Sequence, residues 1–444
     1  DKRIDTSKRM PDDDYLDNRN TNGSLDIGSS INASLERTGD RDWFSIYLNS
    51  GVSYQFDLIG NTLSDTYLYL HSESEIVDRD DDSGNNFNSR IIFEVGQSGT
   101  YYLDAGAYAN SLTGTYTLSA VIDTGPSVDP TAPNPNPDDG RPSPTGFSRL
   151  DGFGQVNAER AFEQLLGFDL QNRPNLGGNL WGLDQIGVPE VWTSSGSFNG
   201  ETGQGVIVAV VDTGVDLDHP EFEGRIVAGY DFVDDDAIPN DEHNHGTHVA
   251  GTIAGANDGS GITGVAYDAL IMPIRVLDSQ GFGTNDDVIS GIRWAADHGA
   301  DVINLSLGGA SFSQEGFNAI QYATGLGSVV VMASGNSGFS HPSYPAHYST
   351  HYGIAVGAVD SSGVMANFSN KAGNIIMDYV TAPGVSIYSS VIDGGYSIYS
   401  GTSMATPHVA GIAALLRGYD NLLTPSQIER ILSSTSSNSS TNYS

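Results

Sequence analysis

Apolar and polar positions alternate in short runs along the N-terminal part of the chain. Residues 43–48 and 101–103 are aromatic and β-branched segments bounded by Gly, Asn, Asp and Ser, and residues 115–119 alternate with a period of two. A period of two is typical of strands with one buried face, and short strands separated by frequent turn residues are typical of a small sandwich. Residues 1–123 are therefore predicted to form an all-β sandwich module.

The pattern changes after residue 123. Residues 124–146 are rich in Pro, Asn, Asp and Gly, which favours a semi-extended linker. Beyond them, continuous apolar runs at 206–211 and 329–331 alternate with helical patterns. Continuous apolar strands are buried on both sides, so this alternation predicts a mostly parallel sheet covered by helices on both faces. The predicted fold class of residues 147–444 is α/β.

Charge and composition narrow the choice of partners. The chain has 55 Asp and Glu against 19 Lys and Arg, a formal charge of −36, and no cysteine. Such a field repels nucleic acid and anionic membranes, so neither is expected as a partner. It suits either a calcium-rich protein or one adapted to salty water, and both interpretations stay open. No apolar run reaches membrane-spanning length, and the start at Asp1 suggests a processed product of a longer precursor.

Three short motifs contain the candidate chemistry. Asp212 follows the apolar run in Val-Asp-Thr-Gly, His245 opens the helical pattern His-Gly-Thr-His-Val-Ala-Gly, and Ser403 lies in Gly-Thr-Ser-Met-Ala-Thr-Pro at another helix start. A serine hydroxyl becomes a useful nucleophile when a histidine removes its proton, and a buried aspartate fixes the tautomer of that histidine. Each motif alone also occurs in ordinary caps and turns. Together, in the order Asp, His, Ser, they indicate a catalytic triad.

With these motifs, residues 172–436 resemble the subtilase family, especially its thermitase-like members. The resemblance implies a serine endopeptidase in which His245 is the general base, whereas His248 is structural. Asn336, in Ala-Ser-Gly-Asn, matches the side-chain oxyanion donor of the family. One departure is Asn244, directly before the base, where the family usually has glycine.

The resemblance also implies that peptide substrates bind as an added strand. Ser337 and Ser343 align with the base of the main specificity pocket, and since neither is acidic we expect a broad, mostly apolar preference. The Tyr344–Pro345 peptide bond is expected to be cis, as in the family. The matching substrate-binding residues are Gly281, Phe282, Gly283, Ser306, Leu307, Gly308, Ala333, Ser334 and Gly335.

Two acidic loops resemble calcium loops of the family, and calcium is the expected cofactor. Calcium takes six to eight oxygen ligands, and dense carboxylates repel one another unless a cation lies among them. The alternative at each loop is a solvated acidic surface. In the second loop a glutamate replaces the family's aspartate. The implied ligands are Asp231, Asp234, Asp236, the Ile238 carbonyl and Asn240 in the first loop, and Glu221, Asp258 and the carbonyls of Ser260 and Ile262 in the second.

A terminal element of the family lies elsewhere in this chain. Subtilases normally end, after the nucleophile helix, with a Gly-rich strand and a helix of the form Gly-x-Val-Asn-Ala. Here that pattern occurs at residues 150–167, upstream of the triad. Our hypothesis is a circular permutation in which this segment docks where the family's last helix lies, with Phe162 and Leu165 buried. The alternative is an ordinary helical spacer.

Residues 24–122 resemble bacterial pre-peptidase C-terminal modules, through Gly-Asp-Arg-Asp-Trp-Phe at 39–44 and Gly-Thr-Tyr-Tyr-Leu at 99–103. The resemblance implies an accessory domain of a secreted protein, for substrate binding or for stability. The sequence thus predicts a secreted, calcium-stabilised serine endopeptidase of broad specificity that acts as a monomer on protein or peptide substrates. The rival hypothesis is a binding protein that retains an idle protease fold.

Overall fold

The computed structural model describes residues 15, 19, 21–50, 52–64, 66–72, 76–80, 88–95, 98–107, 112–122, 146–309 and 312–438. The chain divides into two compact units, an N-terminal β-module and a larger C-terminal unit. Apart from residue 146, the predicted linker 124–146 lies outside the described residues.

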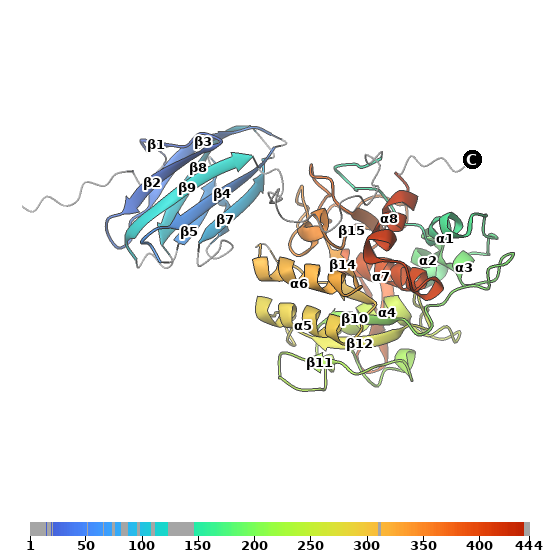
Figure 1. The fold of residues 1–444 in the computed structure, drawn as a ribbon. Helices are drawn as coiled ribbons and strands as arrows, with labels where there is room; N and C mark the ends of the chain where they lie inside the picture. Colours follow the sequence, from blue (N-terminus) through green and yellow to red (C-terminus); the bar gives the residue numbers. More distant parts are fainter. Residues whose placement is uncertain are drawn as a thin grey trace, which may run out of the picture. The chain divides into compact units, whose positions relative to one another are not determined.

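The N-terminal unit is a sandwich of two sheets (Figure 1). One sheet has five strands in the order β1-β3-β8-β5-β6, and the other has four in the order β2-β9-β4-β7. Alternate side chains of β3 point inward, since Phe44, Ile46 and Leu48 are buried and the residues between them are not. This confirms the predicted all-β sandwich. The strands are β1 Gly23–Ser24, β2 Ser29–Leu35, β3 Asp42–Leu48, β4 Ser53–Gly60, β5 Thr66–His71, β6 Ile76–Asp80, β7 Ser89–Glu94, β8 Gly99–Ala107 and β9 Gly114–Ile122.

The C-terminal unit is built around seven parallel strands in the order β11-β12-β10-β13-β14-β15-β16. All residues of β13, β14 and β15 are buried, as expected for strands covered on both faces. A separate antiparallel pair, β17 and β18, lies outside this sheet. The strands are β10 Ile207–Asp212, β11 Tyr230–Asp231, β12 Leu270–Arg275, β13 Val302–Leu305, β14 Val329–Ala333, β15 Ile354–Val359, β16 Tyr379–Pro383, β17 Ile387–Val391 and β18 Gly395–Tyr399.

Helices cover both faces of this sheet, so the predicted α/β class is confirmed. Figure 1 shows α5 and α6 on one side and α4 and α7 on the other, where the last two pack against each other. The α-helices are α1 Ala158–Leu166, α2 Trp181–Gln185, α3 Val188–Val191, α4 His245–Ala254, α5 Asn285–Asp297, α6 Gln314–Gly325, α7 Thr402–Tyr419 and α8 Pro425–Thr435, and the 3₁₀ turns are η2 Gly178–Leu180, η3 Pro220–Phe222 and η4 Ala346–Thr350.

Residues 153–156 extend the sheet beyond β16. Phe153 N donates to Tyr379 O (2.9 Å), and Val156 N donates to Thr381 O (2.9 Å), while Thr381 N donates to Gly154 O (2.8 Å). On the other side of the segment, Ser437 N donates to Gln155 O (2.9 Å). The segment therefore lies between β16 and the residues that follow α8.

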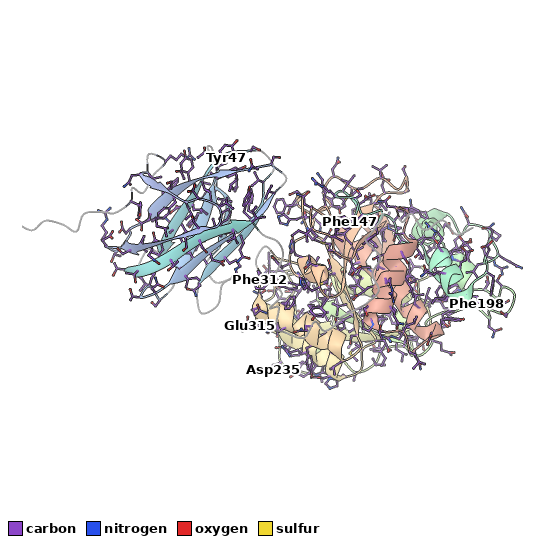
Figure 2. All side chains as sticks on the ribbon, turned by 45° about the horizontal axis from the view of Figure 1, so that its top comes forward. Tyr47, Phe147, Phe198, Asp235, Phe312 and Glu315 are labelled. Carbon is purple, nitrogen blue, oxygen red and sulfur yellow. The ribbon has the colours of Figure 1, made fainter. Side chains whose placement is uncertain are left out.

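Helix α1, which follows this segment, packs into the core of the C-terminal unit. Asn157 caps it by accepting a hydrogen bond from Arg160 N (2.7 Å). Phe162 is fully buried, with its ring 5.5 Å from that of Phe198, which is labelled in Figure 2. Leu165 packs against the same core but is only partly buried, because it lies in the last turn of the helix. The expectation that Leu165 is buried was therefore too strong.

Candidate active site

The three motif residues lie at element ends around the carboxyl edge of the sheet. Asp212 is the last residue of β10, His245 is the first of α4, and Ser403 is the second of α7. Strand β13 is the neighbour of β10, and Ser306, one residue beyond β13, is hydrogen-bonded to Ser403. In open α/β sheets, sites form outside the carboxyl ends of the strands. The topology thus brings Asp212 to His245 and Ser306 to Ser403, although the members of each pair are far apart in the sequence.

The aspartate and the histidine form a tight pair. His245 Nδ1 lies 2.7 Å from Asp212 Oδ1, and the Asp212 side chain is completely buried whereas that of His245 is 21% exposed. Burial alone would lower the pKa of His245, but the charge and hydrogen bond of Asp212, aided by the charge of Asp241, raise this pKa above its usual value. The pair keeps Nδ1 occupied, so Nε2 is the nitrogen left for proton transfer.

Ser403 lies half-buried in the first turn of α7. Its hydroxyl donates to Ser306 O (3.0 Å), and in return the Ser306 hydroxyl donates to Ser403 O (2.8 Å). Asn304 Nδ2 in turn donates to Ser306 Oγ (2.9 Å). These bonds fix the backbone and side chain of Ser403 at a helix N-terminus, where unpaired N–H groups favour a negative charge. The Ser403 hydroxyl thus bonds to the Ser306 carbonyl, and we expect its bond to the base His245 to form when substrate binds, because catalytic hydrogen bonds often tighten only then.

Asn336 is placed to act as a donor. It is exposed, and its Oδ1 accepts hydrogen bonds from Thr402 N (2.8 Å) and Thr402 Oγ1 (3.0 Å). With the amide oxygen bonded to the residue before Ser403, the Nδ2 donors remain for a ligand. Thr402 was not singled out in the sequence, although its position next to the serine was the available signal.

Asp241 was also missed, although it lies only four residues before the base. Its carboxylate is 3% exposed and accepts hydrogen bonds from Thr213 Oγ1 (2.9 Å), Asn244 N (3.1 Å) and Thr247 N (3.0 Å), among others. It therefore ties the turn after Asp212 to the turn before α4. Asn244, where the family usually has glycine, adopts a left-handed φ of 92°, which asparagine tolerates better than most residues.

His248 has a different environment from His245. Its Nε2 lies 3.1 Å from Ile387 O, and its ring stacks 4.6 Å from that of Tyr399. Burial, together with the charge of His245, lowers the pKa of His248 to about 4. A histidine that stays neutral and packed in this way is suited to a structural role.

The expected substrate-binding residues border the ends of the central strands. Ser306, Leu307 and Gly308 follow β13, and Ala333 is the last residue of β14, with Ser334 and Gly335 directly after it. Phe282, which lies between Gly281 and Gly283 in the loop from β12 to α5, is 71% exposed. The Tyr344–Pro345 bond is cis, which confirms that expectation.

The first acidic loop does not assemble the expected calcium ligands. Arg275 Nη1 donates to Asp231 Oδ2 (2.7 Å) and to Asp234 Oδ2 (2.6 Å), and Asp236 Oδ1 accepts from Ile238 N (2.7 Å). Figure 2 shows Asp235, in the same loop, at the periphery of the unit. Within the described residues, no group of three or more His, Cys, Asp or Glu side chains is arranged to hold a metal. A guanidinium from β12 supplies the compensating positive charge instead.

In the second loop, Glu221 is hydrogen-bonded to the residues at both ends of the loop. Glu221 is 4% exposed, and its carboxylate accepts hydrogen bonds from Ala256 N (2.7 Å) and Ile262 N (3.0 Å), at the two ends of the loop, and from Tyr396 Oη (2.8 Å). Asp258 Oδ1 accepts from Ser260 N (2.8 Å). A carboxylate offers about four lone-pair positions, so three donors leave Glu221 one position for a cation. A free carboxylate oxygen position of this kind is one that calcium can take.

A histidine oriented by a buried aspartate, with a serine at a helix start and an amide donor beside it, defines a serine hydrolase. The sequence model described as "Subtilase family" matches residues 203–444. Thermitase from Thermoactinomyces vulgaris is 44% identical over 246 residues, which cover 55% of this chain and 84% of that protein. Subtilisin DY from Bacillus licheniformis is 42% identical over 256 residues, or 57% of this chain and 91% of that protein. The chain belongs to the subtilase family, whose subtilisin-like members are serine endopeptidases.

Comparison with solved structures also places the fold of this chain among subtilisin-like proteinases. A solved structure described as a cold-adapted subtilisin-like serine proteinase has a TM-score of 0.51 and 42% identity, covering 59% of this chain and 93% of that one. Residues 40–107 match the model described as "Bacterial pre-peptidase C-terminal domain", which confirms the resemblance of the β-module. Within the described part of the chain, no helix is long and apolar enough to cross a membrane.

Proposed function

We propose that this protein is a secreted serine endopeptidase that cleaves protein and peptide substrates through an acyl-enzyme. The observation that carries the proposal is the 2.7 Å contact between His245 Nδ1 and the buried Asp212, at the sheet edge where Ser403 lies in the first turn of α7. The resemblance of the β-module to pre-peptidase modules supports an extracellular location.

The chemistry follows from the roles of these groups. His245 Nε2 takes the proton of Ser403 Oγ as the oxygen bonds to the scissile carbonyl carbon, and Asp212 stabilises the imidazolium. The oxyanion accepts hydrogen bonds from Asn336 Nδ2 and from the backbone at the start of α7. The imidazolium then gives its proton to the leaving amine as the C–N bond breaks. Water, deprotonated by His245, hydrolyses the ester and restores the Ser403 hydroxyl.

Substrate preference is proposed to be broad and mostly apolar. The substrate lies as a strand between residues 281–283 and residues 306–308, held by backbone hydrogen bonds that tolerate many sequences. In the specificity pocket, Ser343 Oγ accepts from Asn370 Nδ2 (3.0 Å), and neither Ser337 nor Ser343 carries a charge. Without a carboxylate at its base, the pocket has no counter-charge to select Lys or Arg.

Calcium is proposed for the second acidic loop alone. There Glu221, Asp258 and the carbonyls of Ser260 and Ile262 would hold the ion, which would stabilise the fold and take no part in the chemical steps. The first loop is charge-compensated by Arg275, whose side chain is only 5% exposed.

The proposal is tested by hydrolysis of casein and of a chromogenic peptide with an apolar residue before the scissile bond. The wild-type protein should turn over both, and a serine-directed organofluoride should abolish turnover. Ser403→Ala should retain only the about 10³–10⁴-fold enhancement over water that binding and the oxyanion site provide. A folded wild-type protein that binds these substrates without cleaving them would support the rival, an idle protease fold.

A further inference from the structure

Asn370 is a buried asparagine that the proposed mechanism does not use. It lies in the loop between β15 and β16, and none of its surface is exposed. A buried amide is tolerated when its two N–H donors and its oxygen lone pairs all find partners. The identity of these partners therefore indicates what the residue holds in place.

The donors of Asn370 bind the specificity pocket. Nδ2 donates to Ser334 O (2.9 Å), in the pocket wall after β14, and to Ser343 Oγ (3.0 Å), at the pocket base. The backbone carbonyl of Asn370 accepts hydrogen bonds from Ser334 Oγ (3.1 Å) and from Tyr379 Oη (2.6 Å). Asn370 thus joins the wall and the base of the pocket to β16.

The other groups of Asn370 bind the chain on both sides of Asn336. Its backbone N donates to Gly335 O (2.9 Å), and its Oδ1 accepts from Ser337 N (3.1 Å) and Phe339 N (2.9 Å). The residues directly before and after the oxyanion donor are therefore both fixed by one buried side chain and its own peptide group.

The close approach at Gly335 belongs to the same arrangement. A Cβ atom at Gly335 would lie 2.4 Å from Asn370 Nδ2, and the φ of Gly335 is +103°. Glycine is needed here because no other residue leaves room for the amide or adopts this backbone comfortably. On the opposite side, Gly335 N donates to Thr402 Oγ1 (3.1 Å), which itself donates to Asn336 Oδ1 (3.0 Å).

We propose that Asn370 is a positioning residue that holds the backbone of the oxyanion donor Asn336 in register with the specificity pocket. The inference rests on the proposed endopeptidase function and deepens it. Loss of the Asn370 side chain removes the hydrogen-bond partners of Ser334 O, Ser337 N and Phe339 N, so that the Asn336 Nδ2 donor no longer meets the oxyanion at a fixed distance. Misplacement of a reacting group by about 1 Å can cost about 10²-fold in rate.

The test is a double-mutant cycle in which kcat and KM are measured for wild type, Asn370→Ala, Asn336→Ala and the double variant. We expect Asn370→Ala to lower kcat by about 10–10²-fold, with KM for a small apolar substrate changed by less than about 3-fold. In the Asn336→Ala background the same change should lower kcat by less than about 3-fold, because the donor that Asn370 positions is already gone.

Losses that multiply in the cycle would overturn the inference, since they would show that Asn370 acts independently of Asn336. An unchanged kcat in Asn370→Ala would overturn it as well. If Asn370→Ala does not fold, Asn370→Ser, which keeps a small polar side chain, enters the same cycle with the same criteria. An inactive wild-type protein would instead refute the proposed function and, with it, the inference.

Asn157→Ala serves as the matched control for stability. Asn157 caps α1 and touches neither the pocket nor the triad, and its loss is expected to lower the melting temperature. Below its melting temperature this variant should keep wild-type kcat. If it lost as much kcat as Asn370→Ala, the effect of Asn370 would be one of stability, contradicting a positioning role.

Discussion

At the scale of single residues, His245 determines how activity depends on pH. The base works only when neutral, so kcat/KM falls as the pH drops through the pKa of His245. Desolvation favours the neutral imidazole, but the Asp212 carboxylate, with a smaller contribution from Asp241, outweighs it and raises this pKa above the usual value of 6.5. The acidic limb of the profile should therefore lie above that value.

Asp212→Asn tests this electrostatic pairing. Removal of the charge should move the acidic midpoint of kcat/KM to lower pH. Because the amide also favours the wrong tautomer of His245, the plateau rate should fall about 10⁴-fold. A pH series with a chromogenic peptide measures both effects. The prediction fails if the midpoint stays in place or moves upward.

The triad could be predicted from the sequence because its residues lie in contiguous motifs, and each motif places its residue at an element end. The roles of Asp241, Arg275 and Asn370 were not predicted, because each depends on which segments meet in three dimensions. Arg275, for example, pairs with Asp231, 44 positions away, across neighbouring strands. The carboxylates of the first acidic loop looked like metal ligands because a local pattern does not reveal a distant cation.

At the scale of elements, the pairing of β12 with the first acidic loop makes a stability prediction. Arg275 and Asp231 have side-chain exposures of 5% and 1%, so Arg275→Met should leave a buried carboxylate without its compensating cation, although Asp231 Oδ1 still accepts from Val233 N and Asp234 N. We expect a loss of about 3–5 kcal/mol in the free energy of unfolding. Denaturant titration in the Ser403→Ala background, which prevents self-cleavage, measures it.

Asp231→Asn combined with Arg275→Met is the matched control, because it removes the buried charge as well. The double variant should recover part of the lost stability. A single variant within about 1 kcal/mol of wild type would show that the ion pair contributes little, as exposed pairs do.

The permutation hypothesis also concerns an element, the segment of residues 150–167. Asn438 Nδ2, beyond α8, donates to Asp151 Oδ1 (2.9 Å), so the end of α8 lies beside the start of the segment, and a short link would restore the family's usual chain order. Within the segment, Phe153, Val156 and Phe162 lie in the core of the C-terminal unit.

Truncation distinguishes a core element from a spacer. Deletion of residues 1–146 should leave an active, stable protease, whereas deletion of residues 1–170 should give unstable or insoluble protein. Each large apolar side chain removed takes away roughly 1.5–3 kcal/mol of burial, and the total stability of a domain is only about 5–15 kcal/mol. Thermal melting and casein hydrolysis of both truncated proteins measure the difference. Equal stability would mean that the segment is only a spacer.

At the scale of the whole molecule, calcium is expected to stabilise the fold and leave the chemistry unchanged. Calcium at about 100 times its dissociation constant should add about 2.7 kcal/mol, and a chelator should lower the melting temperature and speed self-cleavage. Glu221→Gln should reduce this calcium response. Asp234→Asn should keep it, because Asp234 pairs with Arg275. A calcium response that vanished with Asp234→Asn instead would place the ion in the first loop.

A burst experiment on the full chain with an active-site acylating ester tests the role of Ser403 as the nucleophile most directly. An acyl-enzyme mechanism predicts a burst of leaving group close to one equivalent per chain, with the acyl group mapped by mass spectrometry to Ser403. Asp212→Asn should slow the burst, and Ser403→Ala should eliminate it. Steady turnover without a covalent adduct, or an adduct at any other residue, would contradict the assignment of Ser403 as the nucleophile.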